Sequence, residues 1–187
     1  PTLEDIESFL RFVDRDPDEI LGVLLPDRRA ASIWNVAVNG VMAGCRPEYL
    51  PVVIAGVEAM CDDAFDLHGV AATTNSAAPL FIVNGPVRKR LDFNAGAGVF
   101  GPGHRANATI GRALRLIIRN VGGAAAGGIT MSTLAHPGYF TYCIAENEEE
   151  SPWSPLSMEA GFAPGESVIS AFAGAAPQTV YDHLSRT

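Results

Sequence analysis

The chain has 187 residues, of which 48% are hydrophobic and only 18% are charged. That composition excludes a disordered chain and indicates one buried core, with a surface apolar enough to favour contact with other subunits. The formal net charge of −8 disfavours nucleic acid and anionic membrane surfaces as partners. The longest apolar runs are interrupted by polar or charged residues, so no membrane span is expected.

The beginning of the chain, PTLEDIESFLRF, is acidic and amphipathic rather than a signal sequence, and the three cysteines have no close spacing. Reduced thiols and a cytoplasmic location are therefore expected.

The first expected element is a helix, because Thr2 is a plausible N-cap with Asp5 three residues later. The elements expected next are a helix at 17–25, a strand at 33–43 and a helix over 47–60. Pro51 leaves two alternatives for the last of these. Either the helix begins at Pro47 and is kinked, or residues 46–50 form a separate turn.

Short apolar runs and glycine-rich stretches alternate in the remainder of the chain. The expected elements are strands at 68–74 and 79–84, a helical turn at 87–93, a glycine-rich loop at 94–104, a helix at 107–121, strands at 138–150 and 167–174, and a terminal helix at 179–187. This alternation predicts an α/β fold, a single domain with a mixed or mostly parallel sheet flanked by helices. Residues 1–30 would form an N-terminal helical segment and residues 31–187 the sheet-and-helix core.

Cys45 is the first candidate catalytic residue. If it lies where a strand gives way to a helix, unpaired backbone N–H groups and the neighbouring Arg46 would favour its thiolate. The carboxyl ends of strands are also where open α/β sheets bind ligands. The alternative is a small apolar residue packed among Met42, Ala43 and Gly44.

Cys143 and Glu146 lie in the expected strand at 138–150 and are further catalytic candidates. Cys45 and Cys143 could meet as a nucleophile with a resolving thiol, or as soft metal ligands beside a carboxylate. No CxxC or HxxxH spacing selects a metal, so we assign no metal ligands and leave the cofactor open.

The glycine-rich loop leads into a helix whose beginning carries His104, Arg105 and Asn107. Exposed backbone N–H groups and a helix N-terminus favour an anion, so a carboxylate or small phosphate is the expected ligand at 101–107. His104 could also act as an acid or base. The alternative is a flexible loop with a capped helix.

Polar residues at the predicted strand ends complete the set of candidates. Arg46, Thr73, Thr74, Asn75 and Asn84 are expected to bind substrate if the strand ends meet at one edge of the sheet.

Other polar residues have simpler interpretations. Arg112, Arg115 and Arg119 fall on one helix face as a solvated or subunit-contacting stripe, and His68, His136 and His183 are isolated and expected to be structural.

Several blocks of the sequence together resemble a bacterial family associated with UGSC-type (seleno)proteins. These blocks are AGCRPEY, NGP, RANATIGR and AENEE. The UGSC tetrapeptide is absent, so no selenocysteine-type redox role passes to Cys45. The resemblance also implies a histidine where Asn75 stands, and it implies that the blocks form a shared site.

Two hypotheses of function follow. The first is a cysteine-dependent enzyme, a hydrolase, lyase or thiol oxidoreductase, in which Cys45 acts on a small carboxylate-bearing substrate held by the 101–107 loop. The alternative is a subunit of a homo- or hetero-oligomeric enzyme that shares its active site with a partner chain, with or without a Cys-ligated metal.

Overall fold

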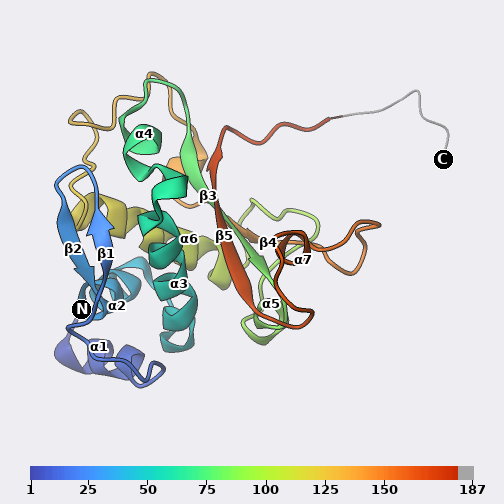
Figure 1. Cartoon of the computed structure of the whole chain (residues 1–187), viewed down its shortest axis with the longest axis horizontal. Helices are drawn as coiled ribbons and strands as arrows, with labels where there is room; N and C mark the ends of the chain where they lie inside the picture. The colour runs from blue at the N-terminus through green and yellow to red at the C-terminus, as the bar shows by residue number, and fades with distance from the viewer. Residues whose placement is uncertain (181–187) are drawn as a thin grey trace.

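A three-stranded mixed sheet lies at the centre of the computed structural model, which describes residues 1–180. The middle strand, β3 (Ala78–Asn84), is parallel to β4 (Cys143–Ala145) and antiparallel to β5 (Val168–Gly174). Helices α3 (Leu50–Cys61) and α6 (Arg105–Asn120) pack against this sheet (Figure 1). The expected α/β fold with a mixed sheet is confirmed.

The expected strand at 33–43 is a helix, α2 (Ile33–Ala43), which packs along α6. The Ser32 side chain caps its first turn by accepting a hydrogen bond from the Asn35 N–H, and Gly44 ends it with a left-handed φ of 85°. These are ordinary start and stop signals. The prediction was wrong because α2 is buried on several sides, which makes its apolar residues nearly continuous and hides the helical period.

The N-terminal segment contains one helix and one hairpin rather than two helices. Helix α1 (Leu3–Leu10) begins with the expected capping box between Thr2 and Asp5. The helix expected at 17–25 is instead β1 (Ile20–Leu24), which pairs antiparallel with β2 (Arg29–Ser32). Its apolar run is short enough to suit either element, and pairing with β2 decides between them.

The ambiguity at Pro51 is resolved by a break between two helical elements. Residues Pro47–Tyr49 form a separate 3₁₀ turn, and α3 begins at Leu50. Pro51 therefore lies in the first turn of α3, where a missing N–H costs no hydrogen bond.

The strand expected at 68–74 is also a helix, α4 (Leu67–Ala72). The Asp66 side chain caps it by accepting a hydrogen bond from the Gly69 N–H. Because α4 replaces a strand, Thr73–Asn75 precede β3 instead of ending a strand of the same sheet.

The remaining elements are short. The helical turn expected after β3 is α5 (Val87–Arg90), and α7 (Leu156–Glu159) precedes β5. Two further 3₁₀ turns occupy Asp63–Phe65 and Pro137–Tyr139, and the second of these shortens the strand expected at 138–150 to β4. Only residues 179 and 180 of the expected terminal helix fall within the described chain, and neither is helical; the rest lies outside the described residues.

Helix α6 approaches β4 closely at Gly111. A Cβ atom at this position would lie 2.5 Å from the Thr141 Oγ1 atom and 2.8 Å from the Tyr142 backbone nitrogen. On its core side, α6 buries Ile110, Leu114 and Ile117 completely. A hydrogen atom at residue 111 is therefore what lets this helix face pack against the sheet.

Replacing Gly111 with alanine is predicted to lower the free energy of unfolding by about 1–3 kcal/mol, as overpacking does. Helix propensity alone would give the opposite sign, since alanine is favoured over glycine by about 1 kcal/mol within a helix. Urea denaturation followed by circular dichroism measures the change. A variant as stable as the wild type, or more stable, would contradict the close packing.

Candidate functional site

Cys45 lies just beyond the C-terminus of α2, not at a strand-to-helix corner. Its backbone N–H donates to the Gly40 carbonyl, and its thiol donates to the Thr109 carbonyl on α6 at 3.3 Å. The end of α2 carries partial negative charge, which does not favour a thiolate. The helix whose first turns lie beside Cys45 is α6.

Burial governs the chemistry of the Cys45 thiol. Only 6% of the residue is exposed, and desolvation raises the pKa of Cys45 to about 11, opposed in part by hydrogen bonding at Thr109 and by the charge of Arg105. At neutral pH the thiol is therefore protonated.

Cys143 is the second buried thiol of this region. It faces Phe81 in the β3–β4 ladder, and its Cβ atom would lie 3.0 Å from a Cβ atom at Gly111. Burial raises the pKa of Cys143, and the nearby Cys45 raises it further. The structure thus brings the two cysteines into one neighbourhood, with both in the free thiol form.

The 101–107 loop holds fewer free polar side chains than the sequence indicated. The Arg105 Nε atom donates to the Gly44 carbonyl at 3.0 Å, which ties α6 to the residue before Cys45. The Asn107 side chain is buried and bonds both backbone groups of Asn94, so it fixes the glycine-rich loop. His104 is the N-cap residue of α6 but makes no side-chain cap.

The first turn of α6 nevertheless keeps unpaired donors. In the part of the chain that the structure describes, the backbone N–H groups of residues 105–107 have no acceptor. A small anion could bind these donors, since they lie at the positive end of a 16-residue helix.

Arg46, another predicted substrate-binding residue, is exposed, and its guanidinium lies 4.0 Å from the Glu48 carboxylate.

Asn84 and Glu146 meet at the carboxyl ends of β3 and β4, as parallel strands require. The Asn84 amide donates to Glu146 and, at 2.9 Å, to Glu148. The Glu146 carboxylate also accepts the Leu156 N–H at 2.9 Å. These hydrogen bonds are structural, and they explain why the Glu146 side chain points inward. Among residues 1–180, the Asn84 Oδ1 atom is the one buried side-chain atom of this network without a hydrogen-bond partner.

Arg88 joins this network, and sequence reasoning missed it. Only 5% of the residue is exposed, and its guanidinium bonds the Glu146 carbonyl together with the carboxylates of Glu148 and Glu149. Hydrogen bonds from Arg88, and then from Lys89, lower the pKa of Glu149 to about 2. The signal in the sequence was the pairing of a basic VRKR turn with an acidic ENEEE run.

Thr73, Thr74 and Asn75 lie at the opposite end of β3 from Asn84. The Asn75 N–H donates to the Thr73 hydroxyl in a local turn, and the Thr74 carbonyl accepts the Thr133 N–H. The predicted substrate-binding residues are therefore divided between the two ends of the sheet.

Within residues 1–180 no three His, Cys, Asp or Glu side chains are grouped closely enough to hold a metal ion. No helix in the described part of the chain has the length and apolar character needed to cross a membrane.

Comparison with known proteins identifies no relative. No protein family, curated protein or solved structure matches the chain. The site must therefore be interpreted from its own geometry.

Alkylation of the native protein is predicted to show a Cys45 pKa well above the free-thiol value of about 8.5. The measurement is the iodoacetamide rate against pH, resolved by mass spectrometry of the cysteine peptides. Cys61 is an internal control because it is only half-buried, and it should react faster than Cys45. A Cys45 pKa at or below 8.5 would contradict a buried, protonated thiol.

Arg88→Ala is predicted to lower the free energy of unfolding by about 1–3 kcal/mol, because it removes the guanidinium from the partly buried Glu148 carboxylate and from the Glu146 carbonyl. Arg90→Ala is the matched control, since Arg90 is exposed on the same short helix, α5. Urea denaturation compares the two variants. Equal and small changes would show that the Arg88 network contributes little to stability.

Proposed function

We propose that this chain is a subunit of a homo-oligomeric enzyme that acts on a small carboxylate-bearing substrate, and that a second copy completes its active site. The observation that carries this proposal is the open edge of the sheet at β5. A buried, protonated Cys45 supports it as well, because the isolated chain holds its candidate nucleophile in an unreactive form.

Strand β5 is a seven-residue edge strand, VISAFAG, with no charged residue and no proline. The Phe81 N–H donates to Tyr142 beside β4, so the odd-numbered residues of β3 bond β4 and the even-numbered residues bond β5. The backbone groups of Ile169, Ala171 and Ala173 consequently point away from β3. Among residues 1–180 they have no hydrogen-bond partner.

Natural proteins usually protect such an edge with lysine, proline, a bulge or a covering segment. Here Phe172 is 41% exposed beside the open edge, which adds apolar area to the unpaired backbone. Two copies of β5 can pair antiparallel about a two-fold axis and join the two sheets into one. A second copy is the occupant that this self-complementary edge favours.

Sedimentation is expected to give a dimer of the purified chain. Ala173→Pro should yield a folded monomer, because it removes an outward N–H group and leaves the β3–β5 ladder intact. Ala176→Pro lies beyond the strand and should remain dimeric. A wild-type monomer at all concentrations, or a dimer unaffected by Ala173→Pro, would contradict pairing at β5.

The second candidate is a cysteine-dependent enzyme whose site is complete in one chain. It is favoured by the position of Arg105, whose charge lowers the pKa of Cys45, and by the unpaired N–H groups at the start of α6. The alkylation experiment above separates this candidate from the first, since it requires a reactive thiolate in the isolated chain. Membership of the UGSC-associated family remains part of this second proposal.

A further inference from the structure

A wide groove runs along the outward face of α6, on the side away from the core. It has a volume of about 1370 Å³ and is bounded on its other side by the segment from Ala124 to Thr141. The α6 side chains that line it are Ala108, Arg112, Arg115, Leu116 and Arg119, which recur at helical spacing on one face. We call this feature the arginine groove.

The charge of the arginine groove is opposite to that of the whole chain. The protein has a net charge of −8, yet three arginines and no carboxylate line the groove. In the described part of the chain, none of these three guanidinium groups forms a salt bridge. The groove thus concentrates positive charge that the protein does not neutralise.

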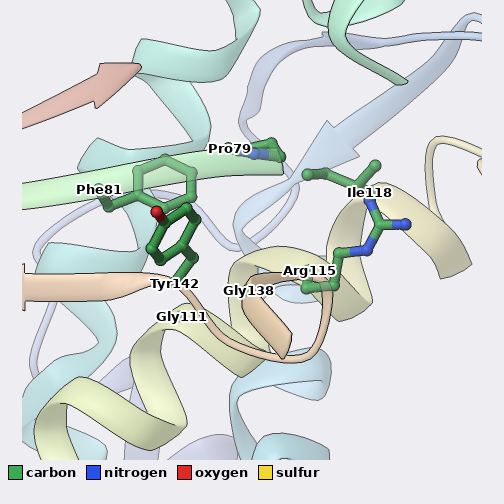
Figure 2. A pocket seen from close by; sticks show the side chains of 7 residues that line it. All are labelled: Pro79, Phe81, Gly111, Arg115, Ile118, Gly138 and Tyr142. Atoms are coloured by element: carbon green, nitrogen blue, oxygen red, sulfur yellow. The ribbon is translucent and has the colours of Figure 1, made fainter. Parts of the chain in front are cut away.

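Arg115 is the arginine placed deepest in the wall. Its guanidinium carbon lies 5.2 Å from the centre of the Tyr139 ring, and burial lowers the pKa of Arg115. Arg115 also borders a smaller neighbouring pocket, in which Figure 2 shows it with Ile118 across from the aromatic rings of Phe81 and Tyr142. A half-buried cation without a counterion is unfavourable, and a bound anion would offset its desolvation.

His136 also lines the arginine groove. Its Nδ1 atom accepts the Gly138 N–H at 3.1 Å, so the hydrogen lies on Nε2. The Nε2 atom is enclosed and has no hydrogen-bond partner among residues 1–180. The surplus donors of the groove are therefore its three arginines, which is the composition expected of a site for oxygen-rich anions.

We propose that the arginine groove binds a small organic molecule that carries two or more carboxylate or phosphate groups. Arg112 and Arg119 are separated by about 10 Å along the helix axis, at about 1.5 Å per residue. Guanidinium groups carried at this spacing on one helix face can each hold one of two linked anionic groups. Leu134 and Phe140, which are 88% and 78% exposed, also line the groove and offer apolar contact to the body of such a ligand.

This site is separate from the Cys45 thiol and from the β5 edge. The Cys45 thiol forms a hydrogen bond with the Thr109 carbonyl of α6, whereas the arginine groove lies on the outward face of this helix. The proposal therefore holds for a monomer or a dimer and does not depend on the proposed function.

Isothermal titration of the full chain with pyrophosphate and with citrate, at matched ionic strength, tests the proposal. At least one probe should bind more tightly than orthophosphate by tenfold or more, and the preferred probe distinguishes phosphate from carboxylate ligands. The double variant Arg112→Gln/Arg119→Gln should weaken that binding at least tenfold. Both side chains are exposed, so the variant should retain the fold.

Arg11→Gln/Arg90→Gln is the matched control, because it removes the same charge from exposed positions outside the groove. It should leave binding unchanged. If both double variants weakened binding equally, the binding would depend on the net charge of the protein and not on the groove, and the proposal would be overturned. Binding of polyglutamate without binding of either small probe would also overturn it, and would identify the groove as a protein-docking surface.

Discussion

The close contact between α6 and β4 at Gly111 is the constraint on which the rest of the structure depends. With hydrogen as its side chain, residue 111 lets the helix approach the Tyr142 backbone, where a Cβ atom would lie only 2.8 Å away. That approach buries the core face of α6 against the sheet and against α2. The position of α6 in turn determines where both regions of functional interest lie.

Helix α6 lies between the two buried cysteines and the arginine groove. Its beginning lies beside Cys45 and Cys143, in an apolar setting that keeps both thiols protonated. Its outward face presents arginines without counterions to a wide groove. A buried neutral thiol is inert until its surroundings change, whereas an unpaired guanidinium is ready to bind an anion. Anion binding is accordingly what we propose for the isolated chain, and partner contact is what we propose would alter the thiols.

The sequence predicted the α/β class, β3 and α6, because each has a strong local pattern. The meeting of Asn84 with Glu146 follows from the parallel pairing of β3 and β4, which the structure supplies. The prediction from sequence failed at 33–43 and 68–74, where buried helices have the continuous apolar residues of strands. Because these segments are helices, Cys45 does not lie at a strand end, and the residues expected to bind substrate lie at two different ends of the sheet. The lack of salt bridges at Arg112, Arg115 and Arg119 could not be predicted, since it depends on which side chains the fold brings to the outward face of α6.

Amide hydrogen exchange of Gly111→Ala against wild type tests the central role of this contact most directly. The account predicts a joint loss of protection in β4, in the residues around Cys45 and in the 136–141 segment, because all three are positioned by α6. The β1–β2 hairpin should keep its protection, since it packs against α3 and α2 instead. A loss confined to α6, or an equal loss across the whole chain, would contradict the account.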